Sequence, residues 1–104
     1  MEITERIINA VQQALKQLYG QDVATNQIQL EATRAEFEGQ LTLVVFPFLR
    51  MSRKKPEDTA QEIGDYLLQN AAEVISKFNV IKGFLNLTIS PAQWIALLQD
   101  IQQN

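Results

Sequence analysis

Two residue types are missing from this chain, and their absence limits the chemistry that it can perform. The 104 residues include no cysteine and no histidine. Without cysteine there are no disulfides, thiolate metal sites or cysteine nucleophiles. Without histidine the chain lacks the commonest general base, the commonest metal ligand and any Ser–His relay. The composition therefore argues against a catalytic or metal-binding domain and favours a non-catalytic module.

Long hydrophobic runs are missing too. No stretch approaches the ~20 consecutive apolar residues that a helix needs to cross a bilayer. The N-terminus also lacks the basic region and apolar run of a signal peptide. We therefore expect a cytoplasmic protein with no membrane partner. The length suits one hydrophobic core, so we expect residues 1–104 to form a single, monomeric domain.

Positive charge is scarce overall but concentrated at one place. The formal net charge is −3, which argues against strong non-specific binding to nucleic acid. Four of the nine basic residues nevertheless fall within six positions. We call this group the basic cluster: Arg50, Arg53, Lys54 and Lys55.

Hydrophobic periodicity predicts two long helices. Apolar residues recur at three- and four-residue spacing over 3–19, and Gly20 suits the position just beyond a helix end. The same spacing recurs over 56–70, with Pro56 in the first turn. Gly64, inside the second helix, suggests the close approach of another element.

Alternating patterns predict a hairpin between these helices. Strands are expected over 28–32 and 40–48, paired antiparallel, with Thr42 facing outward. Pro47 cannot donate to a sheet ladder, so the second strand must end or meet a sheet edge there.

The last third is expected to hold a short helix, one or two strands and a final helix. The short helix covers 71–78, and the strands cover 80–89, where Gly83 marks a bulge or a close backbone approach. Ser90 would cap the final helix, which would bury Trp94. The element order predicts an α+β fold, with a small, mainly antiparallel sheet of three to four strands packed against three to four helices.

One segment imitates a catalytic motif. Arg50-Met51-Ser52-Arg53-Lys54 looks like the Lys-Met-Ser-Lys-Ser signature of class I aminoacyl-tRNA synthetases, whose lysines stabilise the transition state of adenylate formation. That chemistry needs a nucleotide-binding Rossmann fold and a histidine-containing partner motif. Neither fits 104 residues without histidine. A solvated basic loop ahead of a helix is the better interpretation.

Acidic residues offer no better catalytic site. Glu36 and Glu38 fall in an expected turn, and Glu57, Asp58 and Glu62 fall near the start of a helix. Carboxylates in a first helical turn complement the helix dipole, so solvation and dipole complementation explain these residues. The sequence does not indicate an enzyme.

The segment 81–87 is the best candidate binding site. Phe84 and Asn86 are two residues apart, so both point from one face of a strand, and Lys82 shares that parity. An aromatic ring to stack on a base, an amide for its edge and a cation for phosphate suit an exposed RNA base. The alternative is a core phenylalanine beside a solvent-facing asparagine.

The sequence resembles the N-terminal domain of arginyl-tRNA synthetases along essentially its whole length. The run Gly83-Phe84-Leu85-Asn86-Leu87 looks like the Gly-Phe-Ile-Asn-type strand that closes that domain. Phe37-Glu38-Gly39-Gln40, the basic stretch ending at Pro56, and Thr59-Ala60-Gln61-Glu62-Ile63 resemble its middle part.

The resemblance implies a non-catalytic tRNA-binding accessory domain of a longer chain. Such a domain contacts the D-loop at the outer corner of tRNA-Arg, with Phe84 and Asn86 against the nucleotide. A third polar contact would fall at Ile81, which cannot make it, leaving Asn79 or Lys82 as a substitute. Arg53, Lys54 and Lys55 are candidates for the tRNA backbone.

The resemblance also implies what the rest of the parent chain contributes. The parent would be an arginine–tRNA ligase that uses ATP and Mg, whereas this fragment needs no cofactor. Its partners would be tRNA-Arg and the catalytic and anticodon-binding domains of the same chain. The alternative is a protein–protein interaction module that does not bind RNA, and a small enzyme ranks third.

Overall fold

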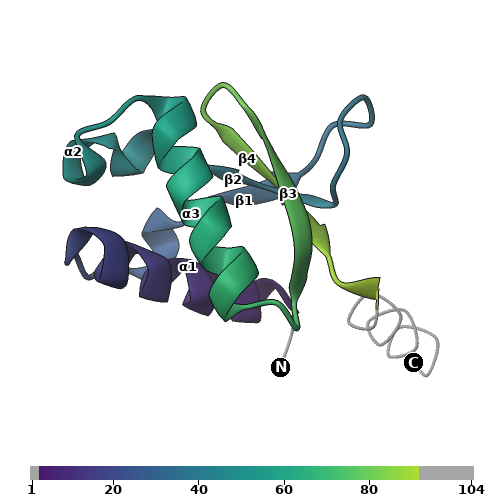
Figure 1. Cartoon of the computed structure of the whole chain (residues 1–104), viewed down its shortest axis with the longest axis horizontal. Helices are drawn as coiled ribbons and strands as arrows, with labels where there is room; N and C mark the ends of the chain where they lie inside the picture. The colour runs from purple at the N-terminus through teal and green to yellow at the C-terminus, as the bar shows by residue number, and fades with distance from the viewer. Residues whose placement is uncertain (1–2, 92–104) are drawn as a thin grey trace.

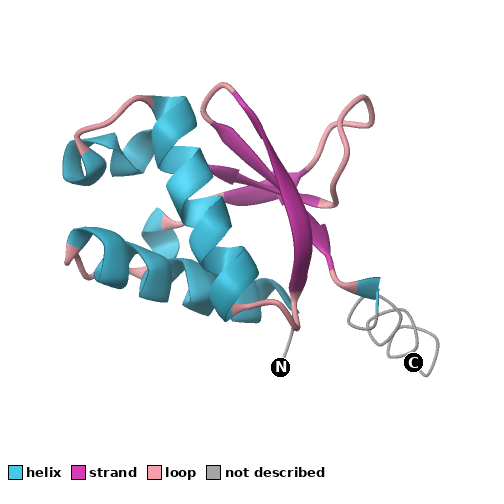
Figure 2. Ribbon diagram, viewed as in Figure 1, coloured by secondary structure: helices cyan, strands magenta, loops and turns pink. Residues whose placement is uncertain are grey.

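Two long helices lie against one face of a four-stranded sheet in the computed structural model, which describes residues 3–91 (Figure 1). Figure 2 shows the helices gathered on one side of the sheet, and we call the other side the open face. The predicted α+β class is therefore confirmed. The helices are α1 (Ile3–Tyr19), α2 (Leu49–Ser52) and α3 (Pro56–Asn70), with 3-10 turns η1 (Thr25–Gln27) and η2 (Phe46–Phe48). The strands are β1 (Leu30–Ala32), β2 (Leu41–Val44), β3 (Ile75–Ile81) and β4 (Phe84–Ile89).

The sheet joins two hairpins. Its strand order is β1-β2-β4-β3, and all neighbours are antiparallel. The predicted hairpin of β1 and β2 is confirmed, and β2 pairs with β4 of the second hairpin. The register places Thr42 of β2 and Asn79 of β3 on either side of Asn86 of β4. Since residues opposite one another point to the same face, these three side chains share the open face.

The hydrophobic core lies between the helices and the sheet. Both predicted long helices are confirmed, and their apolar stripes are buried against the alternate residues of β2 and β4. Gly64 of α3 permits close packing, because a Cβ there would lie 2.5 Å from Cε2 of Phe78 on β3. The fully buried residues of this interface include Ile7, Leu15, Ile63, Leu67, Leu43, Leu85 and Leu87.

The helix predicted over 71–78 is wrong. The chain turns after Asn70, and residues from Ile75 onward form β3, the longest strand of the sheet. Val74, Ile75 and Phe78 have helical spacing, but pairing along β4 satisfies the backbone of this segment instead. The tertiary context therefore overrides the local pattern.

The strand predicted over 40–48 is too long. It ends at Val44, and η2 follows, with Pro47 inside the turn. Thr42 does point away from the helices but is only 6% exposed, so its predicted outward position is not a solvent-exposed one. Part of the basic cluster is helical rather than a loop, because Arg50 lies in α2.

The final helix predicted after Ser90, with Trp94, lies outside the described residues. Within residues 3–91, no helix is long and apolar enough to cross a membrane.

Candidate nucleic-acid interface

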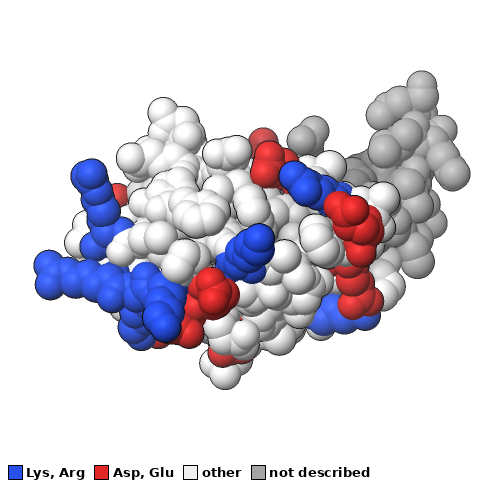
Figure 3. All heavy atoms as spheres, turned by 90° about the horizontal axis from the view of Figure 1, so that it is seen from above, with Lys and Arg blue, Asp and Glu red and all other residues white. Residues whose placement is uncertain are grey.

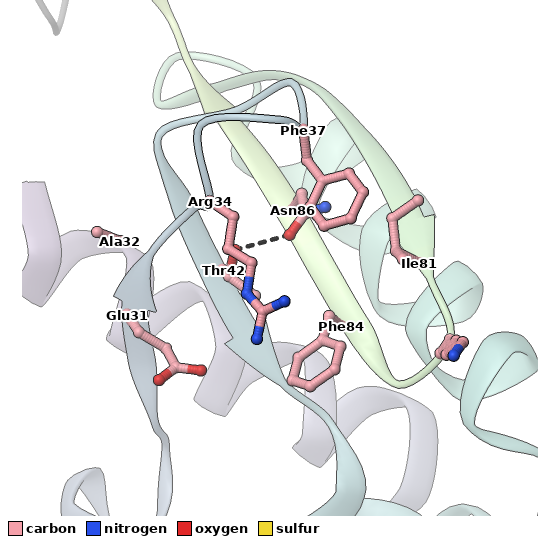
Figure 4. A pocket seen from close by; sticks show the side chains of 9 residues that line it. Glu31, Ala32, Arg34, Phe37, Thr42, Ile81, Phe84 and Asn86 are labelled. Carbon is pink, nitrogen blue, oxygen red and sulfur yellow. Dashed lines mark hydrogen bonds between the residues drawn. The ribbon is translucent and has the colours of Figure 1, made fainter.

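A groove of about 390 Å³ lies on the open face of the sheet (Figure 4). Thr42 and Asn86 form its floor, and Phe84 rises from β4 beside them. The loop that joins β1 to β2 contributes Phe37 and Arg34. The groove thus combines aromatic walls, an amide floor and three charged side chains, the cations of Arg34 and Lys82 and the carboxylate of Glu31.

Phe84 occupies the position that a stacking residue needs. Its side chain is half-buried and lines the groove. The edge of its ring meets Phe46, with ring centroids 5.8 Å apart and planes at 81°. Phe46 in turn rests on Gly83, where a Cβ would lie 2.4 Å from its Cζ. Gly83 is therefore a site of close approach, as predicted, and it allows Phe46 to support Phe84.

Asn86 is not the solvent-facing residue that the alternative interpretation assumed. It is only 2% exposed, and both ends of its amide have partners. The Thr42 hydroxyl donates to its Oδ1 at 2.7 Å, and its Nδ2 donates to Oδ1 of Asn79 at 3.0 Å. An amide oxygen can accept a second hydrogen bond and an amide nitrogen can donate one more. A ligand can use that remaining capacity only by reaching the floor of the groove.

Lys82 differs from its predicted setting, and Asn79 lies next to the floor of the groove. Lys82 does not share the strand parity of Phe84, because it lies in the turn between β3 and β4 with φ 55°. It nevertheless lines the groove and is exposed. Asn79 lies beside Asn86 on β3, and its Nδ2 donates to the backbone carbonyl of Glu38 at 2.8 Å.

The basic cluster lies apart from the groove. It spans α2 and the connection to α3, on the helical side of the sheet (Figure 1). Arg53 ends α2 in the left-handed conformation with φ 58°, and Arg53, Lys54 and Lys55 are all exposed. Figure 3 shows Lys and Arg side chains gathered at the end of the molecule where α2 lies. The structure therefore places the basic cluster and the groove residues on different sides of the sheet, although both were candidates for the same tRNA-binding site.

One member of the basic cluster has a structural partner. Lys54 forms an ion pair with Glu62 of α3, and the Tyr19 hydroxyl of α1 donates to the same carboxylate at 2.8 Å. The hydrogen bond from Lys54 lowers the pKa of Glu62. Burial, followed by the Glu62 carboxylate, raises the pKa of Tyr19. This contact links α1, α3 and the connection between α2 and α3.

The segment that imitates a catalytic signature has a packing role. Ser52 is buried, and its hydroxyl lies 2.7 Å from Oγ1 of Thr59 on α3. Oγ of Ser52 also accepts from the backbone N–H of Lys54 at 3.3 Å, and Met51 packs against the core. Ser52 thus positions the start of α3. Within residues 3–91, no cluster of three or more acidic side chains could hold a metal ion.

Arg34 and Phe37 are groove residues that the sequence analysis missed. Both fall in the break between two predicted strands, where side chains are normally exposed and irregular. The available signal was an aromatic residue beside a basic one in a polar loop, ahead of Gly39. Nothing in that local pattern shows that the loop folds back over the sheet.

The chain is thus a small α+β domain with helices on one side of its sheet and an aromatic, amide-floored groove on the other. A family model described as the arginyl tRNA synthetase N terminal domain matches residues 5–89. The chain therefore belongs to the family of arginyl-tRNA synthetase N-terminal domains, and the resemblance in its sequence is confirmed.

Similar proteins support the same assignment. The arginine–tRNA ligase of Bacteroides thetaiotaomicron is 59% identical over 104 residues, which are 100% of this chain and 17% of that protein. That of Phocaeicola vulgatus is 57% identical over 102 residues, 98% of this chain and 17% of that protein. The structure of Thermus thermophilus arginyl-tRNA synthetase matches with a TM-score of 0.71 and 25% identity, over 92% of this chain and 15% of that one. This chain thus spans about a sixth of its relatives.

Proposed function

We propose that this chain is the tRNA-binding accessory domain of an arginine–tRNA ligase and that it contacts the D-loop of tRNA-Arg through the open-face groove. The proposal rests on the position of Phe84, whose half-buried aromatic ring forms the wall of a groove with an amide floor. Unpaired bases of RNA loops are bound by such aromatic and amide combinations. Membership of the arginyl-tRNA synthetase family supports tRNA as the partner.

Different residues of the groove contact different parts of one unpaired nucleotide. Phe84 stacks on the base, and the rest of the amide of Asn86 meets the base edge at the floor. Lys82 neutralises a neighbouring phosphate from the exposed turn. Asn79, which is held by Asn86 and Glu38, supports the floor and is the weaker candidate for a direct contact.

The basic cluster serves a different part of the tRNA. Because Arg53, Lys54 and Lys55 lie on the helical side, they cannot contact the nucleotide in the groove. We propose that they contact the phosphate backbone elsewhere. Lys54 must exchange its ion pair with Glu62 for such a contact, so Arg53 and Lys55 are the better candidates.

The reaction itself belongs to the rest of the parent chain. We propose that the parent joins arginine to tRNA-Arg with ATP and Mg, and that its catalytic and anticodon-binding domains are the other partners of this domain. Holding the outer corner of the tRNA raises the effective concentration of the acceptor end at the catalytic domain. The domain therefore aids arginylation without taking part in the chemistry.

Replacing the stacking ring tests this proposal. The 104-residue chain and its Phe84→Ala variant would be titrated with a tRNA-Arg transcript in a fluorescence anisotropy assay. Loss of one stacking contact costs ~1–3 kcal/mol, about 5- to 150-fold in affinity. Leu18→Ala is the matched control, because Leu18 is an exposed apolar residue of α1, at 37% exposure, away from the groove.

The D-loop is tested with a second RNA. The 104-residue chain without a substitution, the parent of these variants, should bind a transcript with an altered D-loop as weakly as Phe84→Ala binds the intact transcript. Equal binding of parent and Phe84→Ala to the intact tRNA would contradict the proposal. Binding with no tRNA dependence at all would favour a protein–protein interaction module instead.

A further inference from the structure

The loop between β1 and β2 is fastened to the open face of the sheet at both of its ends. The connection spans residues 33–40, and its part 33–39, which we call the loop 33–39, projects beyond the sheet at the side away from the helices (Figure 1). Gly39, at its end, has φ 128°, and a Cβ there would lie 3.1 Å from the backbone oxygen of Leu87 on β4. A side chain at this position would therefore push the loop away from the sheet.

A row of side-chain hydrogen bonds crosses the sheet beneath this loop. It starts at Thr33, at the beginning of the loop, and ends at the backbone of Glu38, near its end. Its four links are Thr33 to Thr42 at 2.9 Å, Thr42 to Asn86 at 2.7 Å, Asn86 to Asn79 at 3.0 Å and Asn79 to Glu38 at 2.8 Å. We call these four links the polar row.

The polar row has only one consistent direction. A carbonyl oxygen only accepts, so the Thr42 hydroxyl gives its single proton to Oδ1 of Asn86. The Thr42 oxygen must then accept from Thr33. At the other end, Oδ1 of Asn79 accepts from Asn86, which leaves the Nδ2 of Asn79 to donate to the Glu38 carbonyl.

This direction fixes both the floor and the loop. Rotating the amide of Asn86 by half a turn would set its oxygen against Oδ1 of Asn79 and its nitrogen against the Thr42 hydroxyl. The row therefore holds one orientation of a buried amide and ties both ends of the loop to it. An ion pair between Lys77 of β3 and Glu38 reinforces the second attachment.

The fastened loop carries two side chains into the groove. Arg34 and Phe37 both line it, and Figure 4 shows them on the loop side, facing the strands that bear Phe84 and Ile81. Phe37 is half-buried, whereas Arg34 is exposed. A phenyl ring and a guanidinium are the two groups that stack on RNA bases, and guanidinium also binds phosphate.

We propose that Arg34 and Phe37 are further tRNA-binding residues and that Thr42 and Asn79 are positioning residues, which act by holding the loop. This inference rests on the proposed tRNA-binding function of the groove. Phe37 supplies a second aromatic surface for the nucleotide that Phe84 stacks on, and Arg34 binds its phosphate. The site then has two sides, a rigid one on β4 and a loop that the polar row holds in place.

Direct contacts are tested by removing each side chain. In titrations of the 104-residue chain with tRNA-Arg, Phe37→Ala should weaken binding about 5- to 50-fold. Arg34→Gln should weaken it and also reduce the slope of log affinity against log salt by about one, as for one lost phosphate contact. Lys16→Gln is the matched control, since Lys16 is an exposed cation of α1. It should leave the affinity within about twofold of the parent, as a distant surface charge does.

Positioning is tested with Asn79→Asp. The aspartate still accepts from Asn86 but turns an oxygen instead of a donor toward the Glu38 carbonyl, so the loop attachment is lost and one negative charge is added. It should weaken tRNA binding more in the chain with Arg34 and Phe37 intact than when Arg34→Gln and Phe37→Ala are already present, where only the effect of the added charge remains. A general loss of structure would weaken binding equally in both backgrounds.

The outcomes separate this inference from the function on which it rests. If Phe84→Ala weakens binding while Arg34→Gln and Phe37→Ala bind like the parent, the loop is not part of the site and the proposed function stands. If all three bind like the parent, the groove is not the tRNA site. If Asn79→Asp weakens binding equally in both backgrounds, Asn79 is not a positioning residue.

Discussion

Asn86 combines burial with a central place in the candidate site. It is 2% exposed, and its side chain joins Thr42 on one neighbouring strand to Asn79 on the other. A buried amide would be costly without partners, and here both of its ends are satisfied. The residue therefore supports the sheet as well as the groove, whereas Phe84, beside it, is half-buried and lines the wall of the groove.

Asn86→Ala should consequently reduce stability. The substitution removes the acceptor of the Thr42 hydroxyl and the donor to the side-chain oxygen Oδ1 of Asn79, both of which belong to the Asn86 amide. Loss of such buried partners costs ~1–3 kcal/mol. Urea denaturation would measure the free energy of unfolding, with Asn70→Ala, an exposed residue at the end of α3, as control. An unfolding free energy equal to that of the parent would show that the row contributes nothing to stability.

The sequence could identify Phe84 and Asn86 but not their environments. Their two-residue spacing on a strand is a local property, and it correctly placed both on one face. The burial of Asn86 depends on β2 and β3, which contribute Thr42 and Asn79 from 44 and seven positions away. Such register information is not present in any short segment, so the polar row could not be predicted.

At the scale of elements, the two long helices were predictable because their signals are local, whereas the short helix α2 was expected to be a loop. The ends of α1 and α3 follow from apolar periodicity, Gly20 and Pro56. The first part of β3, residues 75–78, was mistaken for a helix because its apolar residues imitate helical spacing, whereas its end, residues 80–81, was predicted as a strand. Only the long-range pairing with β4 decides between the two structures. Similarly, the loop 33–39 looked like an ordinary turn because its attachments lie on other strands.

One carboxylate connects the helices at the surface of their apolar interface. Glu62 of α3 accepts from Tyr19 of α1 at 2.8 Å and pairs with Lys54 at the end of α2. The hydrogen bond from Lys54 holds the pKa of Glu62 below its ordinary value near 4.5. A carboxyl group whose pKa is lower in the folded state stabilises the fold when it is ionised.

The pH dependence of stability should report this contact. Glu62 contributes its full stabilisation above its unfolded pKa and loses it as the pH falls through the lower, folded value. Glu62→Gln should therefore be less stable than the parent at pH 7, and the difference should shrink as the solution is acidified below about pH 4.5. Urea denaturation from pH 7 to pH 3 would measure it. A difference that stays constant with pH would exclude the carboxylate as its source.

On the scale of the whole molecule, the two sides of the sheet carry different kinds of side chain. The helical side contains the hydrophobic core and so provides most of the stability. The open face carries polar and aromatic side chains, arranged by the sheet register and covered in part by the loop 33–39. A net charge of −3 gives the molecule little general attraction for RNA. The proposed binding should therefore depend on specific contacts, those of the groove and those of Arg53 and Lys55, and it should be weak for the isolated domain.

The most direct test of the groove as the tRNA site is an NMR titration. The chain, labelled with ¹⁵N, would be titrated with tRNA-Arg while the backbone amide resonances are followed. The largest shifts should fall on Phe84, on Lys82 and on the loop 33–39, with α1 unaffected. Shifts confined to α1 and the other helices, with the open face unchanged, would contradict the proposed site.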